Sequence, residues 1–187
     1  MIHLILQSIA ACDFSVLKFL YEIRSMPTTL VFIGITEFGS ATTICGISAA
    51  AMLLLALRKQ YSSAIGIFVT CATSSAFVFA LKDLVHRARP DMFYQAYRGE
   101  TTFSFPSGHA AFSLALYGFL ALLVWRSHAS KARKITAITS ATLLIALIGF
   151  SRLYLGVHYL SDVLAGYAVG AISIWVGISS MRYIKTS

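Results

Sequence analysis

The sequence predicts an all-α membrane protein, a polytopic helical bundle in which residues 1–187 form a single integral membrane domain. Three observations support this class. Hydrophobic residues make up 58% of the chain, charged residues make up 12%, and the mean hydropathy is +0.77. The charged fraction of an ordinary soluble domain is about 25%. A soluble domain of this length could not bury so much apolar surface, so the long apolar segments are interpreted as membrane spans.

Five apolar segments are expected to cross the membrane, because a spanning helix needs about 20 largely apolar residues. They are separated by polar connections and cover residues 39–57, 61–81, 110–125, 135–150 and 162–181.

Residues 1–36 are predicted to form an interfacial helix or a degenerate first span. Asp13, Lys18 and Glu22 interrupt the apolar run. A run broken in this way spans a bilayer poorly but suits a helix that lies in the membrane interface. Pro27 is expected to end this helix. A sixth full span hidden in this region is an open alternative.

Membrane orientation explains the basic balance of the chain, whose formal net charge is +8. Basic residues gather at 58–59, 126–134 and 182–185, and these segments alternate correctly to share one face of the membrane. The positive-inside rule makes that face cytoplasmic. The connections 82–107 and 151–161 then lie on the outer face. We therefore expect no nucleic-acid partner.

The outer connection 82–107 is itself basic, with charges at Lys82, Arg87, Arg89 and Arg98. Membrane orientation alone would not place these charges on the outer face, so we expect a site there that requires positive charge. Taken singly, His86, Arg87 and Arg98 are interpreted as interface charges without a role in a site.

Three motifs lie at the outer ends of different spans. The first is Lys82 with Arg89-Pro90, the second is the turn Phe105-Pro106-Ser107-Gly108-His109, and the third contains Arg152, His158 and Asp162. In a packed helical bundle such ends meet at one depth in the membrane. We therefore expect the three motifs to form one site.

The chemistry of these residues fits a phosphoryl group. Three cations, Lys82, Arg89 and Arg152, can surround its oxygens. The Ser107 hydroxyl and the Gly108 amide, at a helix start, would complete the phosphate site.

His158 and Asp162 are spaced to share one face of a helix, where a carboxylate fixes the imidazole tautomer. His158 is then a candidate nucleophile that forms a phosphohistidine. His109 would protonate the leaving alkoxide and then activate water.

Each of these residues alone has an ordinary structural explanation. Lys82 and Arg89 suit snorkelling anchors at the membrane edge, and Ser107 suits a helix N-cap. His158 with Asp162 suits a simple helix-surface pair. All of these explanations must hold together for the site to be accidental, which favours the phosphate site.

We predict no metal and no other cofactor. The chain has seven acidic residues, and of these Asp162 falls in a fixed register within the cationic cluster. Phosphatases that use two metal ions need clustered carboxylates. The five histidines show no zinc spacing, and the three cysteines show no disulfide or metal framework.

The three motifs, in this order, resemble the signature of the type 2 phosphatidic acid phosphatase family, which includes bacterial phosphatidylglycerophosphate and undecaprenyl pyrophosphate phosphatases. The resemblance implies a metal-independent enzyme with His158 as nucleophile, Asp162 as its orienting residue and His109 as general acid. It implies phosphate ligands at Lys82, Arg89, Ser107, Gly108 and Arg152. Membrane members of the family usually have six spans. The first helix is thus missing or degenerate, or the chain is part of a longer protein.

The resulting hypothesis is a lipid phosphatase of the bacterial cytoplasmic membrane with its active site on the outer, periplasmic face. The candidate substrates are undecaprenyl pyrophosphate, which is slightly favoured, phosphatidylglycerophosphate and phosphatidic acid. Its partners would be membrane lipids, and its oligomeric state is open. Two alternatives are a lipid phosphotransferase that uses the same intermediate and a membrane anion or lipid transporter, which would not need the two histidines.

Overall fold

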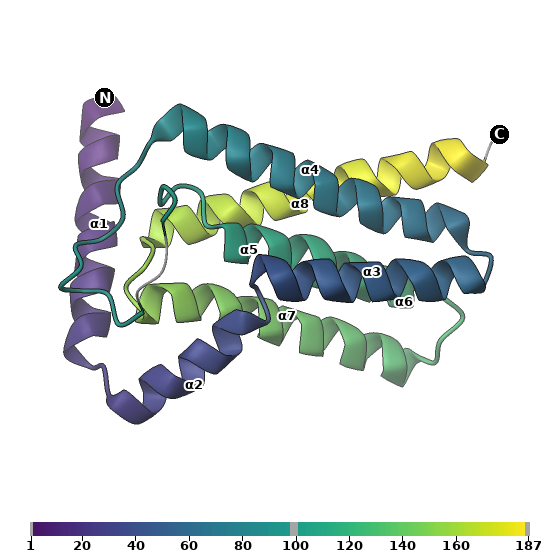
Figure 1. Cartoon of the computed structure of the whole chain (residues 1–187), viewed down its shortest axis with the longest axis horizontal. Coiled ribbons are helices and arrows are strands. Elements are labelled where there is room, and N and C mark those ends of the chain that lie inside the picture. Colours follow the sequence, from purple (N-terminus) through teal and green to yellow (C-terminus); the bar gives the residue numbers. More distant parts are fainter. Residues whose placement is uncertain (1, 98–100, 186–187) are drawn as a thin grey trace.

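The computed structural model describes residues 2–97 and 101–185, and within these ranges the chain is helical with no strand (Figure 1). In chain order the helices are α1 (Ile2–Glu22), α2 (Met26–Glu37), α3 (Ala41–Leu57), α4 (Tyr61–Val85), α5 (Gly108–Ser113), the π-helical turn η1 (Leu114–Gly118), α6 (Phe119–Arg126), α7 (Lys131–Tyr154) and α8 (Leu160–Lys185). The predicted all-α class is confirmed.

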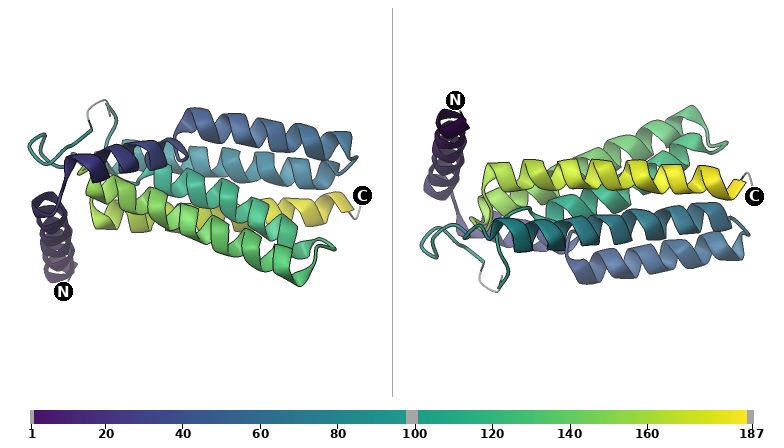
Figure 2. Two further views of the ribbon diagram at one scale, coloured as in Figure 1. Left: turned by 90° about the horizontal axis from the view of Figure 1, so that it is seen from below. Right: turned by 90° about the horizontal axis from the view of Figure 1, so that it is seen from above.

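One helix lies across the end of a bundle formed by the others. α3, α4, α7, α8 and the segment α5–η1–α6 run along the long axis of the molecule (Figures 1 and 2). α1 lies crosswise at the end where α4 and α7 finish and α8 begins. α1 thus runs in another direction than the bundle helices, and its interfacial position stays a prediction.

The chain is a multi-pass membrane protein. Within the described residues, five segments are long and apolar enough to span a membrane: Leu4–Glu22, Tyr61–Val85, Gly108–Arg126, Lys131–Tyr154 and Leu160–Arg182. α2 and α3 form a sixth if they are taken as one span with a bend of 41°. The number of spans, five or six, agrees with the prediction, but the segments that make up this number differ from the predicted ones. The predicted span 39–57 corresponds to helix α3, which qualifies as a span only together with α2. The N-terminal helix α1, by contrast, is long and apolar enough to span a membrane by itself.

Several helices extend beyond their predicted limits. α4 continues to Val85, so Lys82 lies in its last turn and not in the connection. The link between α4 and α5 is correspondingly shorter. The predicted break at Pro27 is confirmed, because α1 ends at Glu22 and Pro27 lies in the first turn of α2. Proline is tolerated there because the first helical N–H groups have no partner within the helix.

Glycines on α8 bring it against the helix that follows the second motif. A Cβ added to Gly166 would lie 2.6 Å from the carbonyl oxygen of Ser107. A Cβ added to Gly170 would lie 2.8 Å from that of Ala111. Such approach of a helix to a neighbouring backbone requires a residue without a side chain. The glycine spacing therefore seats α5 on α8 beside Asp162.

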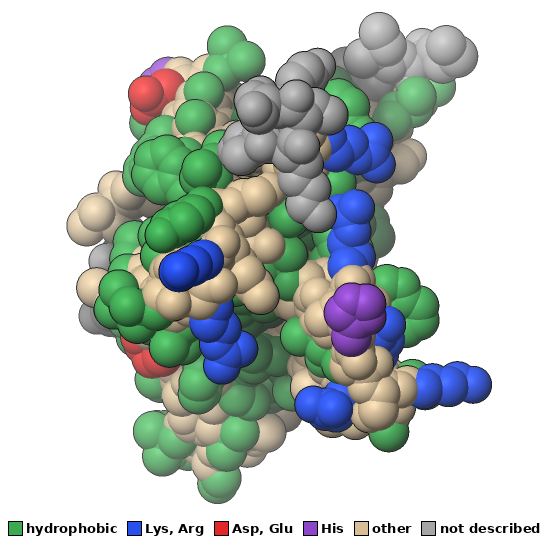
Figure 3. Space-filling model, turned by 90° about the vertical axis from the view of Figure 1, so that its right-hand side faces the viewer, with side chains coloured by type: hydrophobic (Ala, Val, Ile, Leu, Met, Phe, Trp, Pro, Cys, Tyr) green, Lys and Arg blue, Asp and Glu red, His purple; other side chains and the backbone are tan. Residues whose placement is uncertain are grey.

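The end of the bundle opposite α1 is strongly basic. Figure 3 views this end and shows Lys and Arg side chains over much of it. The turn between α3 and α4, the link between α6 and α7 and the end of α8 meet there. These segments contain Arg58, Lys59, Arg126, Lys131, Arg133, Lys134 and Arg182. The basic segments that were predicted to share one face do lie at one end of the molecule.

Candidate active site

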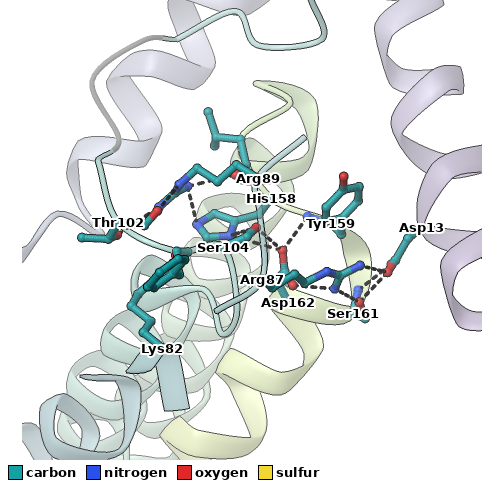
Figure 4. Close-up of polar contacts among 12 residues, drawn as sticks. Asp13, Lys82, Arg87, Arg89, Thr102, Ser104, His158, Tyr159, Ser161 and Asp162 are labelled. Carbon is teal, nitrogen blue, oxygen red and sulfur yellow. Dashed lines mark hydrogen bonds and ion pairs between the residues drawn. The ribbon is translucent and has the colours of Figure 1, made fainter. Parts of the chain in front are cut away.

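The three motifs meet at the end of the bundle nearest α1 (Figure 4). A cavity of about 170 Å³ lies between the helix ends. The predicted site residues that line it are Lys82, Arg89, Gly108, His109 and His158. The other predicted site residues, Ser107, Arg152 and Asp162, are fully buried. The structure thus brings together residues that are widely separated in the sequence.

His158 and Asp162 form a buried pair at the start of α8. Nδ1 of the imidazole lies 3.5 Å from Oδ2 of the carboxylate. The prediction that both residues lie on one helical face is wrong, because His158 precedes α8, which begins at Leu160. The pair forms through a turn at Gly156, whose φ of +70° suits glycine. The carboxylate also accepts the backbone N–H of Tyr159 at 2.9 Å, which fixes it at the helix start.

Ser104 is a member of the site that the sequence analysis missed. It is fully buried, and its hydroxyl donates to Oδ2 of Asp162 at 2.5 Å. The Ser104 oxygen lies 3.3 Å from Nδ1 of His158 and can accept that N–H. The proton therefore belongs on Nδ1, and Nε2 carries the lone pair. The sequence feature that could have indicated it is the position of Ser104 directly before the second motif.

Arg89 lies against that lone pair. Its Nη1 is 3.2 Å from Nε2 of His158 and donates to the carbonyl of Val157 at 2.9 Å. Its Nε donates to the carbonyl of Thr102 at 2.7 Å. These bonds hold the guanidinium beside Nε2, where it can contact a group bound to that atom (Figure 4). A planar, permanently charged group in this position suits the oxygens of a phosphoryl group.

Two further cations come from the ends of α4 and α7. Lys82 is largely buried, and its Nζ donates to the carbonyl of Phe103. Arg152 is fully buried, and its Nη1 donates to the hydroxyl of Thr36 at 2.9 Å. α2 therefore helps to hold a predicted phosphate ligand, although it carries none of the motifs.

Ser107 does not act as a helix cap, although it holds the N-cap position of α5. Its side chain makes no capping hydrogen bond, and within the described part of the chain its buried Oγ has no hydrogen-bond partner. A buried hydroxyl without a partner is costly unless a ligand supplies one. The backbone N–H of Ser107 donates to the carbonyl of Asp162 at 3.0 Å, which fixes the turn beside the pair of His158 and Asp162.

His109 lines the same cavity as His158, from the first turn of α5. The bend between α2 and α3 packs against its ring. A Cβ added to Gly39 would lie 3.2 Å from Cδ2 of His109 and 2.6 Å from a methyl carbon of Ile148. The absence of a side chain at Gly39 therefore leaves room for the histidine.

Burial dominates the electrostatics of His158. Loss of hydration, reinforced by the charges of Arg152 and Arg89 and opposed by the hydrogen bond to Asp162, lowers the pKa of the imidazole from 6.5 to about 4. The ring is therefore neutral at neutral pH, as nucleophilic attack requires.

Arg87 is not the simple interface charge that was predicted. Its guanidinium donates to Oδ1 of Asp162 at 2.7 Å and to Oδ2 of Asp13 at 2.8 Å. The sequence carries no signal for this contact, which joins residues far apart in the chain. His86 ends α4 in a left-handed conformation, and its ring packs edge-on against that of Phe103. Arg98 lies outside the described residues.

The donor groups of the cavity are suited to an anion. Over residues 2–97 and 101–185, no three side chains of the His, Cys, Asp and Glu types lie close enough to hold a metal ion. The cavity instead combines two histidines with the cations Lys82 and Arg89.

The sequence profile of the PAP2 superfamily matches residues 63–185, a range that contains all three motifs. The chain belongs to the PAP2 superfamily. Phosphatidylglycerophosphatase B of Bacillus subtilis (strain 168) is a PAP2-type relative, 29% identical over 170 residues, which are 88% of this chain and 81% of that protein. The lipid A 1-phosphatase of Rhizobium johnstonii is 36% identical over 124 residues, which are 61% of this chain and 47% of that protein.

Two solved structures have a similar fold. The transmembrane PAP2 type phosphatidylglycerolphosphate phosphatase from Bacillus subtilis matches with a TM-score of 0.83 and 27% identity, over 95% of this chain and 88% of that chain. LpxE of Aquifex aeolicus matches with a TM-score of 0.64 and 22% identity, over 91% of this chain and 95% of that chain. The first match, together with the sequence profile, confirms the resemblance to the type 2 phosphatidic acid phosphatase family, and the second shows a likeness of fold.

Proposed function

We propose that this PAP2 protein is a lipid phosphatase that removes a phosphate group from a lipid phosphomonoester or pyrophosphate through a phosphohistidine. One observation carries the proposal. The unprotonated Nε2 of His158 accepts a hydrogen bond from Arg89 in a cavity that His109 also lines. A nucleophile, a candidate acid and a cation for the transferred group therefore share one space.

The first step transfers the phosphoryl group to the enzyme. Nε2 of His158 attacks phosphorus, the bond from phosphorus to the lipid oxygen breaks, and protonated His109 donates its proton to that oxygen. Asp162 holds Nδ1–H and balances the positive charge of the ring. The charge on the transferred oxygens is stabilised by Lys82, Arg89 and Arg152 together with Ser107 and the Gly108 amide.

The second step releases phosphate. Water attacks the phosphorus of the intermediate while His109, now neutral, accepts a proton from the water. The bond between phosphorus and Nε2 breaks, and His158 returns to its neutral form with the proton on Nδ1. Since the site contains the acid, the nucleophile and the phosphate ligands, we propose that it works without a metal ion.

An apolar cavity beside the site suits the lipid part of the substrate. It has a volume of about 200 Å³ and lies between α3, α4 and the segment α5–η1. It shares Ala41, Phe79 and Phe112 with the catalytic cavity. We propose that the headgroup phosphate occupies the polar cavity and that the first part of the tail lies in the apolar one.

The names of the relatives suggest the substrate class. Phosphatidylglycerophosphate comes first, because the relative that bears this activity in its name matches over most of both chains. Undecaprenyl pyrophosphate and phosphatidic acid are the other candidates. We place the site on the outer face of the bacterial cytoplasmic membrane, because the basic end of the bundle faces the opposite way.

The test is phosphate release from these three lipids in detergent, with EDTA present, by the wild type and by His158→Ala. We expect release by the wild type and none by the variant, with the variant folded by thermal melting. Release that EDTA abolishes would contradict the metal-independent mechanism. Transfer of phosphate to another lipid without release, or equal release by the variant, would contradict the proposed hydrolysis.

A further inference from the structure

Asp13 is a buried charge on an otherwise exposed stretch of α1. Its side chain is 3% exposed, whereas those of Lys18 and Glu22 on the same helix are 61% and 58% exposed. It shares the buried face of α1 with Leu17 and Leu20, at the spacing of one helical face. A carboxylate on such a face needs partners, because burying an unpaired charge is costly.

The partners of Asp13 all lie beside the catalytic pair. Oδ1 of Asp13 accepts the backbone N–H of Ser161 at 2.8 Å, and Oδ2 accepts the Ser161 hydroxyl at 2.5 Å. Oδ2 also accepts Nη2 of Arg87 at 2.8 Å. Ser161 directly precedes Asp162, so α1 is fastened to the first turn of α8.

Arg87 connects this carboxylate to Asp162 (Figure 4). Its Nη1 donates to Oδ1 of Asp162 at 2.7 Å and also to the Ser161 hydroxyl at 2.7 Å. Its guanidinium lies 4.2 Å from the ring centre of Tyr159. Burial alone would lower the pKa of Arg87, but the hydrogen bonds and charges of Asp13 and Asp162 raise it. The guanidinium is thus fixed on three sides.

The two oxygens of the Asp162 carboxylate bind different partners, and this gives the network a role. Oδ1 binds Arg87, whereas Oδ2 serves Ser104, Tyr159 and His158. The ion pair with Arg87 at Oδ1 restrains rotation of the carboxylate, so Oδ2 stays aimed at the histidine. If Arg87 lost its second carboxylate, it would have fewer bonds to keep its guanidinium in place.

We propose that Arg87 and Asp13 are positioning residues that hold the Asp162 carboxylate in register with His158, so that docking of α1 completes the active site. Neither residue lines the catalytic cavity. The inference rests on the proposed function, because it assigns a task to residues around the same nucleophile. It also gives α1 a role in the alignment of the active-site residues.

The test is a double-mutant cycle on kcat, with lipid phosphate as substrate. We expect Asp13→Asn to lower kcat about tenfold and Arg87→Ala about 100-fold, because small displacements of a catalytic group cost rates of this order. KM should stay within about twofold in both, since the phosphate ligands are untouched. The double variant should be no slower than Arg87→Ala alone, because both changes break one chain of contacts.

The matched control is Glu22→Gln, which removes an exposed carboxylate from the same helix and should keep the wild-type kcat. Arg87→Lys replaces Arg87→Ala if the latter does not fold, and it should also lose kcat because an ammonium cannot bridge both carboxylates. Effects of the two changes that multiply, or a wild-type kcat in Asp13→Asn, would overturn the proposal.

A second readout does not depend on turnover. Nitrogen NMR of labelled histidine should show the proton of His158 fixed on Nδ1 in the wild type and shared between both nitrogens in Asp13→Asn. An unchanged His158 signal in Asp13→Asn would overturn the positioning role, even if no lipid phosphate were hydrolysed. Lack of hydrolysis by the wild type, with the expected NMR change, would count against the proposed function alone.

Discussion

At the scale of single residues, the proposed mechanism assigns the binding of phosphate and the preparation of the nucleophile to different residues. Lys82 and Arg89 line the cavity, whereas Ser104 and Asp162 are buried against the Nδ1 side of His158. The nucleophile is kept neutral by burial, and its tautomer is set by the buried hydroxyl and carboxylate. This separation predicts different kinetic effects for neighbouring residues.

The lowered pKa of His158 predicts the acid side of the pH profile. Because this pKa is about 4, the ring is unprotonated above that value, and attack is lost only as the pH falls through it. We expect kcat/KM, corrected for ionisation of the substrate phosphate, to stay level down to about pH 5, since kcat/KM reports the free enzyme. An enzyme-dependent fall centred near 6.5, the ordinary value for histidine, would contradict this environment.

Ser104 and Ser107 form a matched pair of buried serines with different expected effects. Ser104→Ala removes a hydrogen bond to a buried carboxylate, so kcat should fall about tenfold or more with little change in KM. Ser107→Ala removes a hydroxyl that has no internal partner in the described chain, so thermal stability should hold while KM and the inhibition constant of inorganic phosphate rise. Steady-state kinetics with phosphate inhibition and melting curves measure both. The same kinetic pattern for both variants would contradict the assignment.

The chemistry of the site was more predictable from the sequence than its geometry. Residue type and order singled out His158 and Asp162 because both groups are costly to place in an apolar chain. Their spacing by four was interpreted as a helical spacing, although the turn that joins them lies within the predicted connection 151–161. The contact of Arg87 with Asp13 could not be predicted from the sequence, because it depends on where a distant helix docks.

At the scale of elements, helix ends and close packing create the site. α4, α5, α7 and α8 each place a terminus at the same end of the bundle. α8 approaches α5 through Gly166 and Gly170, which sets the turn before α5 against Asp162. α1 and α2 contribute from outside this core, through Asp13 and through the Thr36 hydroxyl, which accepts a hydrogen bond from Arg152.

Gly166→Ala should damage both stability and catalysis. Its Cβ would press on the carbonyl of Ser107, which is backbone and cannot rotate away. Overpacking of this kind costs about 1–3 kcal/mol and should also lower kcat, because the second motif must move. The matched control is Gly46→Ala on α3, where nothing lies within 4 Å of the new Cβ. Melting temperature and kcat that match the wild type in Gly166→Ala would show that the contact is not tight.

At the scale of the whole molecule, the protein has a catalytic end and a basic end. Composition and apolar segment lengths were sufficient to predict a bundle of five or six spans. They were insufficient to decide which segments span, because α1 is apolar enough to cross a membrane yet lies crosswise. Such a direction is set by side-chain contacts at the bundle end, and hydropathy does not contain that information.

Orientation predicts which end an impermeant reagent reaches. Starting from a protein without its native cysteines, Met92→Cys tests the catalytic end and His128→Cys the basic end, since both side chains are exposed. We expect an impermeant maleimide to label the Met92→Cys variant in intact spheroplasts and the His128→Cys variant only after permeabilisation. The reverse pattern would place the active site on the cytoplasmic face.

The most direct measurement for the central claim is a search for the covalent intermediate. Enzyme mixed with lipid phosphate is quenched in base, which preserves phosphohistidine, and is digested and analysed by mass spectrometry. The account predicts one phosphorylated histidine, His158, that is absent from His158→Ala. Turnover with phosphate on another residue, or in a His158→Ala protein that stays active, would contradict the account.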